Sequence, residues 1–254
     1  MNLVFITQDE PIFLHDSIQY LVSTLPKYCK IKGIVLLDVS PYGGASSKVK
    51  LFIKTFKLYG LIYTLKYSYL YFIKKYIRRK TVSNLLKKLK INRVIFNESI
   101  NHENSQKIIK NLEPDLLISI ACNQILLKST INISKIATLN LHCSLLPKHR
   151  GLMPSFWTLY NKDDVVGVTV FIMDEGIDTG DIITQKTIRV DTNNQSKMIR
   201  ITKKLGIECI IKTIELIREG NYKKIKQDNN QATYNTYPTK SEIKTFLKRG
   251  NTFI

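Results

Sequence analysis

Asn140 and His142 stand two positions apart at the end of a short apolar stretch, Ala137-Thr138-Leu139. Alternate residues of a strand point to the same side, so we expect both side chains to emerge together. Later in the chain, the turn 173–181 holds four carboxylates and two glycines. A carboxylate beside His142 would orient the imidazole and raise its basicity, and the Asn140 amide would donate to a carbonyl oxygen that gains negative charge. Together they predict acyl transfer to an amine without a covalent enzyme intermediate. Taken singly, each fits a strand cap, a core histidine or a solvated turn.

Alternating strand and helix patterns must position these residues. The predicted strands are Leu3–Thr7, Ile31–Leu37, Val94–Phe96, Asp115–Ile120 and Leu139–Cys143, with helical periodicity up to about Leu25 and over 105–112 and 194–218. Such alternation predicts right-handed crossovers and a mostly parallel sheet, whose strands bind ligands at their carboxyl ends. Val166–Met173 and Asp181–Ile188 flank the acidic turn and predict an antiparallel excursion. The expected fold is therefore α/β, with a Rossmann-like, mostly parallel sheet.

Length and composition favour one main domain. With 254 residues and 44% hydrophobic content, we expect a core domain over 1–218 and a short C-terminal extension over 219–254 that packs on it as a strand, hairpin or short helix. No charge-free stretch is long enough to span a membrane, and the N-terminus lacks the basic region of a secretory signal. The four cysteines are far apart, as expected of reduced thiols in the cytoplasm.

Sequence fingerprints of nucleotide and metal sites are absent. Neither Gly-x-Gly-x-x-Gly nor the P-loop pattern occurs. The glycine loop 43–48 fits a phosphate cradle or, more simply, a turn with a serine cap. The four histidines are scattered, with no Cys-x-x-Cys pair and no zinc-protease spacing, so no metal is expected.

The segment Lys48–Arg93 is unusually basic and aromatic. The chain holds 39 Lys and Arg against 20 Asp and Glu, a net charge of +19, and this segment carries fourteen of the basic residues and no acidic one. Aromatic residues at 52, 56, 59, 63 and 67 follow helical spacing, so one stripe should face something apolar. Four interpretations stay open: a crossover helix lying on the sheet, a subunit contact, an interfacial membrane helix, and a platform for single-stranded nucleic acid.

A longer pattern surrounds the candidate residues. It reads Asn140-Leu141-His142-Cys143-Ser144-Leu145-Leu146-Pro147-x-x-Arg150-Gly151, followed by Gly167-Val168-Thr169 and by Asp-Glu-Gly-Ile-Asp-Thr-Gly-Asp-Ile-Ile at 174–183. Over about residues 114–185, it resembles the formyltransferases that use 10-formyltetrahydrofolate, a family that includes glycinamide ribonucleotide, methionyl-tRNA and nucleotide-sugar N-formyltransferases.

The resemblance implies roles for particular residues. Asn140, His142 and Asp178 match the catalytic triad. The co-substrate would be 10-formyltetrahydrofolate, and its pterin would lie between two loops, whose residues are Cys122, Asn123, Gln124, Ile125 and Leu126 in the first and Met173, Asp174, Glu175, Gly176 and Ile177 in the second. Under this reading, 1–218 is the formyltransferase catalytic domain.

Three acceptors compete within the resembled family. The segment 151–157 resembles nucleotide-sugar formyltransferases, which modify amino sugars for surface polysaccharides such as lipopolysaccharide O-antigen, and the short extension after Arg218 suits that group. We therefore expect a nucleotide-linked amino sugar, such as a dTDP-amino-dideoxyhexose, with Lys148 and Arg150 as candidate diphosphate ligands, and a homodimer without a stable nucleic-acid partner.

The net charge leaves two alternatives. Phosphate contacts would favour a methionyl-tRNA formyltransferase-like enzyme. From a different class, a non-catalytic basic module would bind nucleic acid or membrane through 48–93 and leave the triad without a role.

Glycinamide ribonucleotide ranks third among the acceptors, because residues 8–11, Gln-Asp-Glu-Pro, differ from the glycine-rich phosphate loop of the enzyme that uses it.

Overall fold

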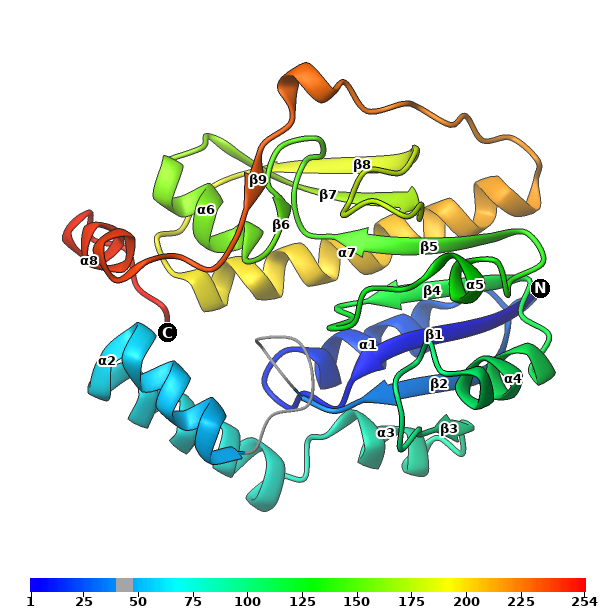
Figure 1. Ribbon diagram of the computed structural model, residues 1–254, viewed down its shortest axis with the longest axis horizontal. Coiled ribbons are helices and arrows are strands. Elements are labelled where there is room, and N and C mark those ends of the chain that lie inside the picture. Colours follow the sequence, from blue (N-terminus) through cyan, green and yellow to red (C-terminus); the bar gives the residue numbers. More distant parts are fainter. Residues whose placement is uncertain (40–47) are drawn as a thin grey trace.

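A seven-stranded sheet forms the centre of the protein in the computed structural model, which describes residues 1–39 and 48–254 (Figure 1). Its order is β3-β2-β1-β4-β5-β7-β8, and a separate ribbon pairs β6 with β9. The strands are β1 (Asn2–Gln8), β2 (Lys30–Leu37), β3 (Arg93–Val94), β4 (Leu116–Ile120), β5 (Ala137–His142), β6 (Arg150–Gly151), β7 (Val165–Ile172), β8 (Ile182–Arg189) and β9 (Tyr234–Asn235). Pairs from β3 to β5 are parallel, whereas β7 and β8 are antiparallel. The predicted α/β fold with an antiparallel excursion is confirmed.

Helices cover both faces of the sheet. They are α1 (Leu14–Thr24), α2 (Lys48–Phe72), η1 (Ile73–Ile77), α3 (Val82–Lys88), α4 (Glu103–Asn111), α5 (Lys128–Ile131), α6 (Pro154–Asn161), α7 (Gln195–Arg218), η2 (Asn229–Gln231) and α8 (Lys240–Lys248). Because side chains alternate along a strand, Leu3 and Phe5 of β1 pack with α1, α3 and α7, while Val4 and Ile6 pack with α4 and α5. Within the described ranges, no helix combines the length and the apolar character needed to cross a membrane.

The sheet topology fixes where a ligand site belongs. The chain order reverses between β1 and β4, which pair in parallel at the centre of the sheet. In open α/β sheets, ligands bind beyond the carboxyl ends of the strands next to such a reversal. Asn140 and His142 lie at that end of β5, the neighbour of β4, and pair with Phe171 and Thr169 of β7.

Helix α2 of the basic segment does not lie across the sheet. Gly60 breaks α2 with a non-helical conformation (φ 79°, ψ 175°), and α2 contacts α8 at the edge of the molecule (Figure 1). Tyr59 and Tyr63 pack edge-on against Phe253, with ring centroids 4.9 and 5.0 Å apart. The interpretation of a crossover helix lying on the sheet is therefore wrong for α2, because Tyr59, Tyr63 and Tyr67 pack on the end of the chain, whereas Phe52 and Phe56 are exposed. The predicted glycine loop 43–48 precedes this helix and lies outside the described residues, except for Lys48.

The C-terminal extension crosses the front of the domain (Figure 1). After α7, Ile225 pairs with Ile182 at the start of β8, β9 then pairs with β6, and α8 packs on α6 and α2. Phe246 and Phe253 stack on each other and on Phe156 of α6, with centroid distances of 4.6 to 6.3 Å. The extension thus shares a core with the main domain and passes directly over the loop that follows β5.

Candidate active site

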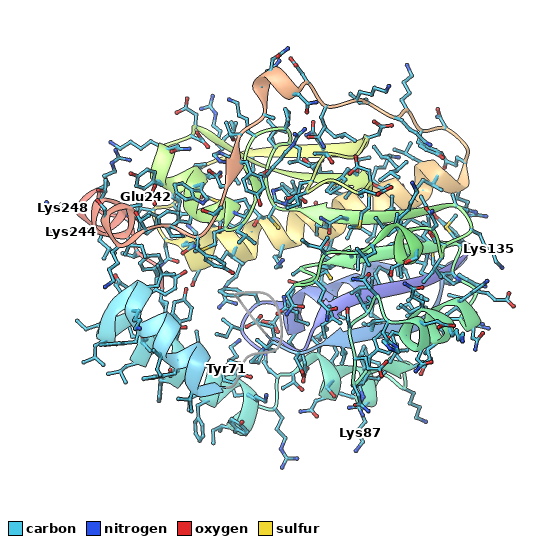
Figure 2. All side chains as sticks on the ribbon, viewed as in Figure 1. Tyr71, Lys87, Lys135, Glu242, Lys244 and Lys248 are labelled. Carbon is cyan, nitrogen blue, oxygen red and sulfur yellow. The ribbon has the colours of Figure 1, made fainter. Side chains whose placement is uncertain are left out.

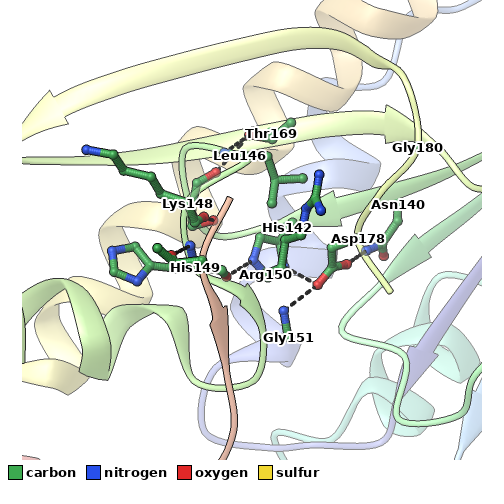
Figure 3. Close-up of polar contacts among 12 residues, drawn as sticks. Asn140, His142, Leu146, Lys148, His149, Arg150, Gly151, Thr169, Asp178 and Gly180 are labelled. Carbon is green, nitrogen blue, oxygen red and sulfur yellow. Dashed lines mark hydrogen bonds and ion pairs between the residues drawn. The ribbon is translucent and has the colours of Figure 1, made fainter. Parts of the chain in front are cut away.

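Asp178 connects the two residues at the end of β5 (Figure 3). The Nδ2 amide of Asn140 donates to Asp178 Oδ1 at 3.4 Å, and His142 Nδ1 lies 3.5 Å from Oδ2. The main-chain N–H of Gly151 donates to the same Oδ2 at 2.8 Å. The side chains of His142 and Asp178 are only 8% and 12% exposed. The structure therefore brings together the three residues that the sequence assigns to a triad.

The imidazole of His142 has a defined orientation. Its Nε2 lies 2.7 Å from the main-chain carbonyl of His149. A carbonyl oxygen only accepts, so Nε2 carries the hydrogen in this bond and the lone pair of the neutral ring is on Nδ1. That lone pair lies on the side of Asp178. Proton transfer by this ring would therefore take place at Nδ1.

The turn that carries Asp178 is held in an unusual backbone conformation. Asp178 has φ 55°, in the left-handed region, which Asp and Asn enter more readily than most residues. Two residues later, a Cβ on Gly180 would lie 1.7 Å from the carbonyl oxygen of Ile172, so only glycine fits. The side-chain amide of Gln227 donates to the carbonyls of Asp178 and Gly180 at 2.9 and 2.8 Å. This contact from the extension holds the part of the turn that carries Asp178.

Sequence reasoning missed Gln227. No spacing signal could have found it, because it lies 49 positions from Asp178 in a polar stretch without periodicity. It also missed His149, which is buried between Asn235 Nδ2 (2.9 Å from its Nδ1) and Asp163 (2.7 Å from its Nε2). These contacts fix the carbonyl that orients His142.

The loop after β5 is fastened to the antiparallel strands. The buried Thr169 hydroxyl donates to the Ser144 carbonyl at 2.8 Å and accepts from the Leu146 N–H at 3.1 Å. At the other end, Gly151 has φ 88°, and a Cβ there would lie 2.4 Å from the carbonyl of Asn235. Close pairing with β9 thus requires glycine, and it aims the Gly151 N–H at Asp178.

The two predicted diphosphate ligands have different environments. Arg150 is buried, and its guanidinium donates to Gln227 Oε1 at 2.8 and 3.1 Å and to Asn229 Oδ1 at 3.0 Å. Lys148 is exposed and points away from Asp178 (Figure 3). The hydrogen-bond donors of Arg150 are therefore used by the C-terminal extension, whereas Lys148 is at the surface.

The two loops predicted to bind the pterin lie side by side. Cys122, Leu126 and Met173 pack in one apolar cluster, and Lys128 forms a 2.7 Å ion pair with Glu175 across the loops. Burial raises the pKa of the Cys122 thiol to about 11, so it stays protonated at neutral pH.

Several polar groups of these loops have partners within the protein. Asn123 donates to the Asp38 carbonyl, Gln124 accepts from the hydroxyl of Ser99 and the N–H of Ile100, and Asp174 accepts from the Gly176 N–H and the Thr179 hydroxyl. Ile125 and Ile177 are exposed at the surface. The loops are therefore shaped by their own contacts before any ligand arrives.

The first helix has an internal anion at its N-terminus. The Glu10 carboxylate accepts main-chain N–H groups of Ile12, Phe13 and Leu14 at 2.7, 2.8 and 3.1 Å, and burial raises the pKa of this carboxyl. Helix N-termini at the carboxyl end of a strand are common phosphate sites. Here the protein's own carboxylate fills that position. Among the described residues, no cluster of three or more His, Cys, Asp or Glu side chains is arranged to hold a metal ion.

Comparisons with known proteins identify sequences and folds similar to this chain. A profile of the formyl transferase family matches residues 71–214. A methionyl-tRNA formyltransferase of Methylacidiphilum infernorum is 42% identical over 138 residues, which cover 54% of this chain and 43% of that protein. The chain thus spans less than half the length of the curated relatives that it matches.

Two solved structures share the fold. The N-formyltransferase from Helicobacter canadensis, in complex with folinic acid and dTDP-3-aminofucose, aligns with a TM-score of 0.57 at 18% identity, covering 100% of this chain and 84% of that one. Phosphoribosylglycinamide formyltransferase from Bacillus halodurans aligns with a TM-score of 0.59 at 14% identity, covering 85% and 95%.

Proposed function

Because the chain belongs to the formyl transferase family, we propose that it transfers a formyl group from 10-formyltetrahydrofolate to a primary amine. The observation that carries the proposal is the convergence of Asn140 and His142 on Asp178 at 3.4 and 3.5 Å. An amide donor, an imidazole and a carboxylate are the groups that acyl transfer between two nitrogen atoms requires.

The reaction moves one bond and one proton. The neutral amine of the acceptor attacks the formyl carbon, the bond between this carbon and N10 of the folate breaks, and the amine proton passes to N10. We assign the proton to His142 Nδ1 first, because Nε2 donates to the His149 carbonyl. The imidazolium then lies next to Asp178, whose carboxylate stabilises it and assists proton delivery to N10. The second hydrogen of the Asn140 amide stabilises the oxyanion of the tetrahedral intermediate.

The folate would lie between loops 122–126 and 173–177. Their shared apolar cluster of Cys122, Leu126 and Met173 suits the face of a pterin ring. The N–H groups of Met173 and Gly176 are engaged by Thr138 and Asp174, so the polar pterin contacts would come from other main-chain groups of these loops. The folinic acid bound by the Helicobacter canadensis relative supports a folate donor.

For the acceptor, we favour a nucleotide-linked amino sugar. The Helicobacter canadensis relative, which binds dTDP-3-aminofucose, aligns with the whole chain, including the extension that covers the site. Glu10 argues against glycinamide ribonucleotide, since a phosphate at the N-terminus of α1 would have to displace a carboxylate with three hydrogen bonds. Lys148 remains the candidate diphosphate ligand of the two, because it is exposed.

Methionyl-tRNA is the second candidate. The 42% identity to a methionyl-tRNA formyltransferase and the net charge of +19 both favour it. The 43% coverage of that protein leaves its remaining length without a counterpart in the match.

One assay separates the candidates. The purified protein is mixed with 10-formyltetrahydrofolate and, in parallel, dTDP- and UDP-linked amino sugars, methionyl-tRNA or glycinamide ribonucleotide, and tetrahydrofolate release is followed by absorbance. We expect turnover with an amino-sugar nucleotide that disappears in the Asp178→Asn variant. Turnover with methionyl-tRNA alone would select the second candidate. Absence of turnover with every acceptor, in protein that binds folate, would refute formyl transfer to these amines.

A further inference from the structure

One face of the basic segment carries apolar side chains that nothing in the described structure covers. Along the second half of α2 and into η1, Ile62, Leu65, Tyr69, Phe72 and Tyr76 are each between 50% and 70% exposed. Their spacing of three and four residues places them along one side of a helical segment. We call these five residues the exposed stripe. Soluble monomers rarely expose a contiguous apolar surface of this kind without a partner.

The other side of the same helix is already in use. Tyr59, Tyr63 and Tyr67 pack on the aromatic core around Phe253, and Thr64 is fully buried. The helix is therefore held in the fold by one face, and the exposed stripe is a second apolar face. The first half of α2 repeats the pattern, because Val49, Phe52, Ile53 and Phe56 are also exposed.

Cations outnumber carboxylates around the exposed stripe, where Asp16 of α1 pairs with Lys74 and Lys80. No acidic residue occurs between Asp38 and Glu98, whereas Lys57, Lys66, Arg78 and Arg79 are all exposed. The neighbouring α8 adds Lys244 and Lys248 at the same edge of the molecule, together with one carboxylate, Glu242 (Figure 2). An apolar strip flanked by Lys and Arg is the pattern of a helix that lies in the interface of an anionic bilayer.

We propose that the exposed stripe docks the protein on the surface of an anionic lipid bilayer, with the surrounding lysines and arginines on the lipid phosphates. A second copy of the chain fits less well, because pairing two such faces would oppose cations with cations without an acidic partner in the segment. Single-stranded nucleic acid also fits less well. Base stacking uses aromatic rings, but two of the five stripe residues, Ile62 and Leu65, are aliphatic, as is the neighbouring exposed residue Ile77. This proposal is independent of the acceptor and of formyl transfer itself.

Sedimentation with vesicles tests the proposal on the full chain. We expect it to co-sediment with vesicles of phosphatidylglycerol and phosphatidylcholine and to stay in solution with phosphatidylcholine alone. It should be released as salt rises from about 0.1 to about 1 M, because the electrostatic screening length then falls from ~10 Å to ~3 Å. The stripe variant Ile62→Ser/Leu65→Ser/Tyr69→Ser should bind the anionic vesicles at least about tenfold more weakly than the native chain. The charge variant Lys57→Glu/Lys66→Glu/Arg78→Glu should also lose binding.

Matched controls alter other surfaces by the same amount. Ile108→Ser/Ile136→Ser/Ile188→Ser removes three exposed apolar side chains elsewhere, and Lys27→Glu/Lys110→Glu/Lys224→Glu makes the same change in net charge at other exposed positions. Both should keep binding. Circular dichroism and the melting temperature show whether each variant is folded.

Three results would overturn the proposal. The first is that the folded stripe variant binds each kind of vesicle as tightly as the native chain does. The second is that the native chain is a dimer in light scattering and does not bind vesicles, while the stripe variant is a monomer. The third is salt-sensitive binding of single-stranded RNA through this face, again without vesicle binding.

Discussion

Gln227 in the C-terminal extension donates its side-chain amide to the main-chain carbonyl of Asp178 at 2.9 Å. The same amide reaches the carbonyl of Gly180, and its oxygen accepts from Arg150. Neither end of this side chain contacts Asn140 or His142 in the structure. Gln227 is therefore a positioning residue, which sets where the turn presents its carboxylate.

Replacing Gln227 should lower kcat more than it changes KM. Gln227→Ala removes the hydrogen bonds that hold the turn of Asp178, so the carboxylate is less well placed. Because a misplacement of about 1 Å at a reacting group costs roughly a hundredfold in rate, we expect kcat to fall by about ten- to a hundredfold. Gln227→Glu keeps the acceptor for Arg150 but sets a carboxylate against two carbonyls, so it should lose as much kcat while melting closer to the native chain. Gln231→Ala, in the same extension and bonded only to Asp228 in the contacts described, is the control. Unchanged kcat in both Gln227 variants would leave Gln227 with a purely structural role.

The triad variants should lose turnover. General acid–base help contributes about 10²–10⁴-fold and one oxyanion donor about 10²–10³-fold, so His142→Asn, Asn140→Ala and Asp178→Asn should each reduce kcat at least about a hundredfold. Double variants should lose less than the product of the single losses, as groups that act as one unit do. Steady-state kinetics, with the acceptor that the turnover assay identifies, measures both effects. His102→Asn, at an exposed helix cap, is the control, and a His142→Asn protein that keeps most of its kcat contradicts the mechanism.

Arg150 and Lys148 should respond in different ways. Arg150→Ala removes a buried guanidinium that donates to the side-chain oxygens of Gln227 and Asn229, and the loss of these charge-assisted hydrogen bonds should cost about 1–3 kcal/mol of unfolding free energy. Lys148→Ala should leave the melting temperature unchanged and raise the acceptor KM. Thermal melts and acceptor titrations of the two variants separate these roles. A rise in acceptor KM for Arg150→Ala at unchanged stability would return Arg150 to the substrate.

Cys122 should make the protein less stable at alkaline pH. Burial raises the pKa of its thiol from about 9 to about 11, so the folded state holds this proton more tightly than the unfolded chain. The stabilisation is complete below pH 9 and is lost as pH rises through about 11, a change of about 2–3 kcal/mol. Urea unfolding at pH 8, 9.5 and 11 measures it, with Cys122→Ala as the comparison. A fall in stability of the same size in both proteins would assign the change to other groups.

The sheet and the pair on β5 follow from local sequence. Apolar runs such as Leu3–Thr7 and Ile31–Leu37 predict their strands within a residue or two. The two-residue spacing of Asn140 and His142 puts both on one side of β5, because strand geometry has a period of two. The glycines and carboxylates of 173–181 mark a turn for equally local reasons.

Two features were visible only in the tertiary structure. They are the contacts that position the triad and the surface on which α2 packs. Gln227 reaches Asp178, and Asn235 reaches His149, from distant parts of the chain. Their hydrogen bonds leave no periodic signal, since a single polar side chain in a loop has many alternative partners. The helical spacing of 52–67 indicated an apolar partner, which Tyr59, Tyr63 and Tyr67 have, whereas Phe52 and Phe56 are exposed. Gly60 breaks the helix, and Tyr59 and Tyr63 face Phe253. Local sequence fixes which face of an element is apolar, whereas the surface that covers it is chosen by packing among segments far apart in the chain.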